Sequence, residues 1–281
     1  MGADSTSRRL LKKALFPVLN EASYSFFQTV AKAWDIRTGS WAEPELDLIP
    51  LAVRPGDTVL DIGANYGLYT YHLSRAVRPS GKVYAFEPVP FTHATLCRVS
   101  RLLRFRNVEI VPKGCSDTNG AVRFTLPLQG VGPLSAGLAH LEGRRNDRDG
   151  KGIHFPYEKT QEILCDVIRL DDFLPKGLTI SFIKCDIEGA ELLALRGAGR
   201  LILDHRPTVV CEINPWFLDG FGIHLSELLE FFSEKGYRLY RYEKTGGHKI
   251  VKAVASEEVV EDNYLFLHPS RATSFASLIA S

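Results

Sequence analysis

The sequence predicts an α/β protein in which helices cover both faces of a mostly parallel sheet. Apolar runs of strand length alternate along the chain with helix-forming segments, which is typical of successive βαβ units. Several of these runs end in acidic residues, at the end of a strand where open α/β sheets bind ligands. The chain has 281 residues, of which 45% are hydrophobic, and it can therefore bury a large core.

The stretch from Thr58 to Gly67 predicts the first strand, a turn and the start of a helix. Gly63 allows a sharp backbone turn, and Gly67 allows the next helix to approach closely. Asp61 is an acid in an apolar strand, and its burial is costly unless it is paired. We therefore expect Asp61 at the carboxyl end of the strand, beside a loop that binds a nucleotide cofactor. A plain strand-to-helix connection is the alternative interpretation.

The stretch from Gly81 to Pro88 predicts a second strand that also ends in an acid. Glu87 follows Gly67 by 20 residues, a gap that a helix and a parallel strand would fill. An acid in that position can accept hydrogen bonds from both hydroxyls of a ribose. The loop and the acid together are more specific than either alone.

The loop does not fit the patterns of the commonest nucleotide sites. A G-x-G-x-x-G motif beginning at Gly63 requires glycines at 65 and 68, where the chain has Asn65 and Leu68, and this counts against NAD. The G-x-x-x-x-G-K-[S/T] phosphate loop is also missing. An acid before the loop suits a ligand with a cationic, amino-acid-like end, such as S-adenosylmethionine.

Four segments, in order, resemble FkbM-type methyltransferases of the class I S-adenosylmethionine-dependent superfamily. These segments are Val59–Gly67, Val83–Pro90, Cys115–Gly120, and Ile183–Glu191 followed by Leu195–Ala198. The resemblance implies a Rossmann-like sheet of about seven mostly parallel strands with a C-terminal antiparallel strand. It also implies methyl transfer from S-adenosylmethionine to a hydroxyl on a sugar, a glycolipid or a secondary metabolite.

The same resemblance implies which residues hold the cofactor. The loop would wrap the methionine part through Gly63, Ala64, Asn65 and Gly67. Asp61 would lie near the cofactor's ammonium group, directly or through water, and Glu87, followed by Pro88, would hold the ribose.

Ser116 and Asp117 are further candidates for holding the cofactor, and they lie beyond the apolar run 108–111, which predicts a third strand. Asp117 could accept a hydrogen bond from the adenine amino group. The sequence Ser-Asp-Thr-Asn-Gly is equally typical of an ordinary Asx turn, and both interpretations stay open.

The fourth segment supplies candidate catalytic acids. A buried strand is predicted over 179–185, after which Asp186 and Glu188 alternate onto one face before a helix begins at Gly189. Methyl transfer requires an acceptor that is aligned with the methyl carbon and that loses a proton, and both acids suit this task. The alternative for Glu188 is to cap the helix, which is worth roughly 0.3–1 kcal/mol.

A fifth strand over 207–213 places Glu212 and Asn214 on one side, with Glu212 as a third catalytic candidate. Together with Asp186 these residues could offer oxygen ligands to a divalent metal such as Mg²⁺. The resemblance does not specify a metal. We prefer a role for Glu212 in orienting the acceptor or bonding to the backbone. Closing strands are expected near 237–242 and 263–268.

The predicted organisation is an N-terminal helical extension or lid over residues 1–50 and a methyltransferase domain over 51–281, with an insertion near 120–170. Two strands are expected in the insertion, over 121–126 and 162–168, with a polar segment between them. Arg8–Phe16 is amphipathic, so peripheral contact with a membrane surface is one hypothesis. The preferred hypothesis is a helix that packs across the domain and gates acceptor access. Its apolar stripe contains Phe26, Phe27, Val30 and Trp34, and Trp34 and Trp41 are candidates for lining the acceptor pocket.

Charge and cysteine content indicate few macromolecular partners. A net charge of +1 gives no reason to expect nucleic acid, and Arg98, Arg101, Arg104 and Arg106 are interpreted as a solvated outer face. Five cysteines in apolar surroundings are expected to be reduced, which favours the cytoplasm. No stretch reaches about 18 consecutive apolar residues, so no transmembrane helix is expected.

Two other function classes remain possible. A nicotinamide-dependent oxidoreductase would share the sheet and Glu87, but Asn65 and the lack of a clear Tyr-x-x-x-Lys pair disfavour it. A catalytically silent binding module with the same fold is disfavoured by the retained acids 61, 87, 117, 186 and 188.

Overall fold

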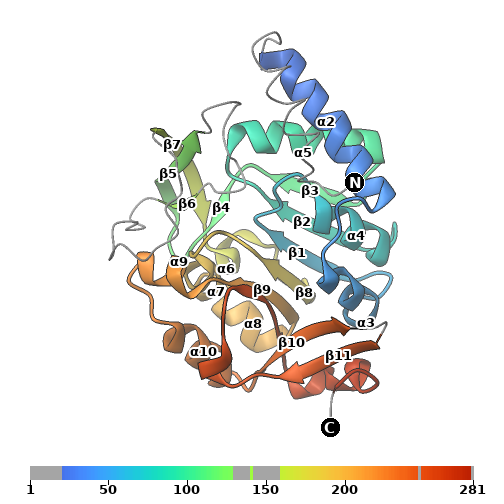
Figure 1. Ribbon diagram of the computed structural model, residues 1–281, viewed down its shortest axis with the longest axis vertical. Helices are drawn as coiled ribbons and strands as arrows, with labels where there is room; N and C mark the ends of the chain where they lie inside the picture. The colour runs from blue at the N-terminus through green and yellow to red at the C-terminus, as the bar shows by residue number, and fades with distance from the viewer. Residues whose placement is uncertain (1–20, 129–139, 142–158, 246–247, 280–281) are drawn as a thin grey trace.

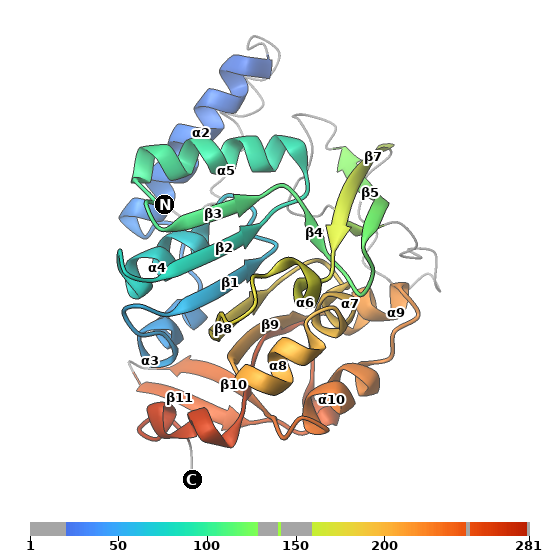
Figure 2. The ribbon, with the colours of Figure 1, turned by 180° about the vertical axis from the view of Figure 1, so that it is seen from behind.

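The computed structural model of the protein describes residues 21–128, 140–141, 159–245 and 248–279. Its centre is an eight-stranded sheet in the order β11-β10-β12-β9-β8-β1-β2-β3 (Figures 1 and 2). The strands are β1 Thr58–Ile62, β2 Lys82–Phe86, β3 Val108–Val111, β8 Ile180–Cys185, β9 Thr208–Ile213, β10 Arg238–Thr245, β11 His248–Ala253 and β12 Asp262–Leu267.

Neighbouring strands from β3 to β9 are parallel, and β12 runs antiparallel to both β9 and β10. This arrangement confirms the expected Rossmann-like sheet with an antiparallel C-terminal strand. The sheet has one strand more than expected, because the chain after β10 turns back as β11 and pairs with it. The predicted closing pair is formed by β10 and β12.

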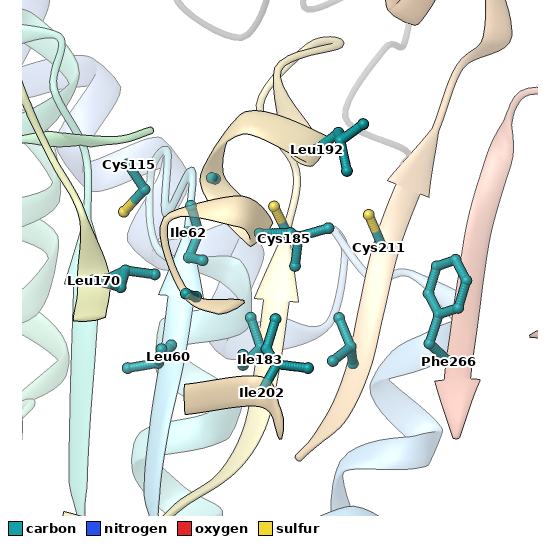
Figure 3. Packing of buried hydrophobic residues seen from close by; sticks show 14 of the residues in the cluster. Leu60, Ile62, Cys115, Leu170, Ile183, Cys185, Leu192, Ile202, Cys211 and Phe266 are labelled. Atoms are coloured by element: carbon teal, nitrogen blue, oxygen red, sulfur yellow. The ribbon is translucent and has the colours of Figure 1, made fainter. Parts of the chain in front are cut away.

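Alternating side chains of the central strands build a core on each face of the sheet. Leu60 and Ile183 belong to the larger core, with residues of α7 Glu191–Arg196, α8 Gly199–His205 and α10 Leu225–Ser233 (Figure 3). Val59 and Phe182 point to the opposite core, with residues of α3 Ile49–Ala52 and α4 Leu68–Val77. Helices therefore cover both faces, as predicted.

A second, four-stranded sheet has the order β4-β7-β5-β6. Its strands are β4 Gly114–Cys115, β5 Gly120–Leu128, β6 His140–Leu141 and β7 Lys159–Ile168. The predicted strands near 121–126 and 162–168 are confirmed as the antiparallel pair β5 and β7. Most of the polar segment between them lies outside the described residues.

The N-terminal region contains α2 Glu21–Thr38, which packs on α5 Pro90–Leu103 (Figures 1 and 2). Ser25, Thr29, Ala33, Asp35 and Ile36 are the buried residues of α2 among those whose side chains are described. The predicted packing stripe is wrong, because Phe26, Val30 and Trp34 are exposed. The amphipathic stretch Arg8–Phe16 lies outside the described residues.

The remaining helices are short. They are η1 Pro44–Leu48, α6 Leu170–Phe173, α9 Pro215–Gly220, η3 Ser256–Glu258 and η4 Pro269–Phe275. None of the five cysteines is in a disulfide, and all except Cys97 are buried. Over the described part of the chain, every helix is too short or too polar to cross a membrane.

Candidate active site

A cleft of about 750 Å³ opens at the carboxyl ends of β1, β2 and β8. Eight of the predicted site residues line it: Asp61, Gly63, Ala64, Asn65, Glu87, Pro88, Asp186 and Glu188. Gly67, Ser116, Asp117 and Glu212 do not line it. The fold therefore brings together the acids that follow three separate strands.

The glycine-spaced loop after β1 is held tightly against its neighbours. The backbone amides of Gly63 and Ala64 donate to the Phe86 carbonyl at 3.1 and 2.9 Å. Gly63 has a φ of +81°, and a Cβ there would lie 1.9 Å from the backbone oxygen of Asp186. Gly67 has a φ of +93°, and a Cβ there would lie 2.7 Å from Leu96 Cδ1. Both glycines are thus required by conformation and by space.

Glu87 is a buried acid that the backbone holds in place at the end of β2. Its Oε2 accepts from the Asn65 amide at 3.0 Å, and its Oε1 accepts from the Val89 amide at 2.9 Å. Burial raises the pKa of Glu87 to about 7, although these two hydrogen bonds oppose the rise. Each oxygen still has a lone pair for a further donor, as a ribose site requires.

Asp61 lies in the floor of the cleft and is only 1% exposed. Its Oδ2 accepts a hydrogen bond of 2.5 Å from the Thr70 hydroxyl on α4. Burial raises the pKa of Asp61 to about 6, against the lowering effects of Thr70 and the nearby charge of Lys184. The carboxylate is therefore paired, as its position in an apolar strand requires.

Lys184 is the central residue that the sequence interpretation missed. It is 1% exposed, and its Nζ lies 3.2 Å from Asp186 Oδ2 and donates to Asn263 Oδ1 at 2.6 Å. The ammonium group also lies 4.9 Å from the centre of the Tyr69 ring. Burial alone would lower the pKa of Lys184, but the charges of the surrounding acids outweigh it and raise that pKa.

A signal for Lys184 was present in the sequence. A lysine inside the apolar run of β8 is almost never buried without compensating charges. Asp186 lies two residues further along the chain, and two-residue spacing places both side chains on the same face of the strand.

Asp186 and Glu212 form a pair of acids in different protonation states. Burial tends to raise the pKa of Asp186, but the charge of Lys184 and hydrogen bonds from Glu212 and Lys184 hold it below its usual value. Burial and the negative charge of Asp186 raise the pKa of Glu212 to about 10. At neutral pH, Asp186 is therefore ionised, and a protonated Glu212 donates a hydrogen bond to it.

Two further acids, Glu43 and Glu45, come from the segment before β1, and the sequence interpretation also missed them. Glu43 lines the cleft beside Trp41, and its Oε2 is buried without a hydrogen-bond partner among the described residues. Burial raises the pKa of Glu43, and it raises that of Glu45 to about 7. Of the two tryptophans considered for the acceptor pocket, Trp41 lines the cleft, whereas Trp34 is 64% exposed.

The turn after β8 assigns different roles to its two glutamates. Glu191 Oε1 accepts from the amides of Ile187 and Gly189 at 3.0 and 3.1 Å. Glu188 lines the cleft with a φ of +59°, an uncommon conformation for a residue with a side chain. The backbone amides at this turn therefore donate to Glu191. The alternative prediction, in which Glu188 caps the helix, assigned this role to the wrong glutamate.

Ser116 and Asp117 lie beyond β4, between the second sheet and α7. The Ser116 amide donates to the Ile168 carbonyl at 2.9 Å, and its hydroxyl donates to Asp117 Oδ1 at 3.3 Å. Arg169 Nη1 donates to the Asp117 carbonyl at 3.0 Å. The described geometry is that of a connecting turn, and a contact between Asp117 and adenine stays a prediction.

Of the three residues considered as metal ligands, Asn214 caps a helix and the two acids are bonded to each other. Asn214 Oδ1 accepts from the amides of Trp216 and Phe217 at 3.1 and 3.2 Å and so caps α9. Glu212 is bonded to Asp186, beside the Lys184 ammonium group. Within the described ranges, no group of three or more His, Cys, Asp or Glu side chains is arranged to hold a metal ion.

Comparisons with a family model and with curated proteins identify the same methyltransferase family. Residues 61–239 match the family described as Methyltransferase FkbM domain. The chain is 30% identical over 171 residues to Methyltransferase 1 of Beauveria bassiana (strain ARSEF 2860), covering 58% of this chain and 67% of that protein. It is 29% identical over 178 residues to 31-O-demethyl-FK506 methyltransferase FkbM of Streptomyces tacrolimicus, covering 58% of this chain and 67% of that protein.

A solved structure titled as methyltransferase FkbM, from Methylobacillus flagellatus KT, aligns with a TM-score of 0.45 at 19% identity. The alignment covers 95% of this chain and 60% of that chain, so the protein spans less than two thirds of its length.

Proposed function

This chain belongs to the FkbM methyltransferase family, and on that premise we propose that it transfers a methyl group from S-adenosylmethionine to a hydroxyl oxygen of a sugar, a glycolipid or a secondary metabolite. The observation that carries the proposal is the position of Asp186, which lines the cleft after β8, beside the glycine-spaced loop, with its Oδ2 3.2 Å from the Lys184 ammonium nitrogen. An ionised carboxylate in a cleft can accept the proton that a hydroxyl loses when it is methylated.

The donor groups of the cleft fit S-adenosylmethionine. Glu87 offers two carboxylate oxygens for the ribose hydroxyls, and Asp61 offers a negative charge for the ammonium group of the methionine part. Asn65 Oδ1 is buried and has no hydrogen-bond partner among the described residues, so it is available to a donor group of the cofactor. When bound, S-adenosylmethionine supplies a methyl group on a sulfonium centre that is already activated for transfer.

The protein's own part in the reaction is to position the acceptor and to take its proton. Asp186 accepts the hydroxyl proton as the acceptor oxygen becomes bonded to the methyl carbon. Lys184 keeps Asp186 ionised before this step, and the hydrogen bond from Glu212 orients the carboxylate. Glu188, which lines the same cleft, is assigned to acceptor positioning.

The wall formed by Trp41 and Glu43 supports binding of the acceptor beside Asp186. An indole ring offers a flat apolar surface, and the buried Glu43 Oε2 offers a hydrogen-bond acceptor for a hydroxyl. This combination favours a hydroxylated ring over an anionic acceptor, which the carboxylates of the cleft would repel.

The first test is isothermal titration calorimetry with S-adenosylmethionine and S-adenosylhomocysteine, and with NAD as the control. Affinity on the order of micromolar for the adenosyl compounds, with no binding of NAD, is the expected result. Transfer of a labelled methyl group to a panel of hydroxylated acceptors then tests the reaction. Tight binding of NAD alone would instead favour an oxidoreductase.

A further inference from the structure

Helix α2 carries an apolar stripe that no described residue covers. Phe26, Val30 and Trp34 follow at intervals of four residues, so they share one face, and they are 66%, 45% and 64% exposed. The buried positions of α2 are different ones, including Ser25, which accepts a hydrogen bond from Arg98 of α5. The stripe is therefore not the surface through which α2 joins the domain.

The exposed apolar side chains are concentrated on this part of the molecule. Eight large apolar residues are exposed among those described, and four of them belong to α2 and α5: Phe26, Val30, Trp34 and Leu102. Both views show α2 and α5 together at the end of the molecule that lies away from the C-terminus (Figures 1 and 2). A clustered apolar surface of this kind is typical of an interaction site.

The same end of the molecule is cationic. Residues 90–106, which form α5 and its exit, contain no acid and four exposed arginines: Arg98, Arg101, Arg104 and Arg106. Arg37 at the end of α2 is exposed as well. The whole chain has a net charge of only +1, so this positive charge is a local feature.

We propose that the surface formed by Phe26, Val30, Trp34 and the arginines of α5 binds an anionic lipid membrane. Apolar and aromatic side chains flanked by arginines match the boundary between acyl chains and negatively charged headgroups. Tryptophan and arginine both place an apolar part in such a boundary while their polar atoms stay hydrated. A second copy of the chain fits less well, because two such surfaces would bring like charges together.

Helix α2, which carries the stripe, also contacts the wall of the cleft through a residue outside the stripe. Lys32 of α2 lies 4.2 Å from the ring centre of Trp41 and 4.9 Å from that of Tyr66, and Trp41 lines the cleft. A membrane bound at this surface would therefore contact α2, the helix that also packs against the cleft wall. This consequence rests on the proposed function and favours an acceptor attached to a lipid, whereas the membrane binding itself does not depend on catalysis.

The test is flotation of the full chain with phosphatidylcholine vesicles, with or without an equal share of phosphatidylglycerol, at low and high salt. We expect flotation with the anionic vesicles and a strong loss of it at high salt. The double variant Phe26→Ser/Trp34→Ser should lower the partition coefficient at least about tenfold. Arg101→Gln/Arg106→Gln should lower it on anionic vesicles. Leu203→Ser, an equally exposed apolar residue on α8 at a distance from α2, should leave it unchanged.

Several results would overturn the proposal. The first is that the chain does not float with anionic vesicles, and the second is that the Phe26→Ser/Trp34→Ser variant floats as well as the wild type. The third is that the wild-type chain forms a dimer and does not bind vesicles, and that this variant is monomeric. The fourth is that the chain binds a single-stranded oligonucleotide and does not bind vesicles. Thermal unfolding of each variant shows that it is folded. Titration of the wild-type chain with S-adenosylmethionine separates the two proposals, because a chain that floats but does not bind the cofactor would contradict only the proposed function.

Discussion

The ammonium nitrogen of Lys184, in β8, lies 3.2 Å from Oδ2 of Asp186, which follows the strand, and both residues line the cleft. The charge of Lys184 lowers the pKa of Asp186, whereas burial and the charge of Asp186 raise the pKa of Glu212. The candidate base is thereby ionised before an acceptor arrives.

Replacement of Lys184 should strongly destabilise the fold. Lys184→Met removes a buried charge and leaves Asp186, whose side chain is 33% exposed, without its partner, so the unfolding free energy should fall by up to about 3–5 kcal/mol, the cost for a fully buried pair. Urea denaturation measures this cost. The control is Lys113→Met, which breaks an exposed ion pair of 3.0 Å with Asp166 and should cost about 0–1 kcal/mol. Equal losses in both variants would show that the buried pair has no special importance.

The variants Asp186→Asn and Glu212→Gln should show which of the two acids accepts the proton. Asp186→Asn removes the proton acceptor and should lower turnover about 10²- to 10⁴-fold with little effect on S-adenosylmethionine affinity. Glu212 is already protonated near neutral pH, so Glu212→Gln keeps a hydrogen-bond donor and should retain most of the turnover. The methyl-transfer rates of both variants test this assignment. A greater loss of turnover in Glu212→Gln than in Asp186→Asn would identify Glu212 as the proton acceptor.

Glu87→Gln should weaken cofactor binding. A charge-assisted hydrogen bond to the ribose is worth about 1.5–3 kcal/mol, and the amide retains only part of this. Calorimetric titration with S-adenosylhomocysteine measures the change. Glu109→Gln on the adjacent β3 alters an exposed acid paired with Lys82 and should bind normally. If Glu87→Gln binds S-adenosylhomocysteine as tightly as the wild type does, Glu87 does not hold the ribose.

Glu87 should also make stability depend on pH in the direction opposite to that of an ordinary ion-paired acid. Its pKa is about 7 in the folded protein, against 4.5 for the unperturbed group, so the folded state binds more protons between these values. The free energy of unfolding contributed by Glu87 therefore falls as pH rises from about 4.5 to 7. The stability of Glu87→Gln relative to wild type should rise over that range in thermal unfolding scans, and a constant difference would contradict the assignment.

Gly63→Ala should damage both the fold and the cofactor loop. The added Cβ would meet the Asp186 backbone oxygen at 1.9 Å, so the loop or the end of β8 must move. Gly177→Ala is a matched control, because Gly177 has a φ of +88° but open space around it, and strain there costs only about 1–2 kcal/mol. We expect Gly63→Ala to lose more unfolding free energy than the control and to lose cofactor binding. Equal behaviour would show that conformation alone sets the cost.

The order of the central strands along the chain, and the acids at or after their ends, could be predicted from local sequence patterns. Periodicity and glycine spacing are local properties, which is why β1, β2, β8 and β9 were predicted close to their observed limits. The same local signals identified Asp61, Glu87 and Asp186, because an acid at the end of an apolar strand is conspicuous in any short window.

Which of these residues meet, and in what charge state, depends on the folded structure. The two-residue spacing places Lys184 and Asp186 on one face, but Asn263 of β12 and Glu43 of the N-terminal segment come close to Lys184 only through folding. Trp41 and Trp34 are the same type of residue, but Trp41 lines the cleft and Trp34 is exposed to solvent. Burial and long-range electrostatics depend on distances between segments far apart in the chain, and no local pattern encodes those distances.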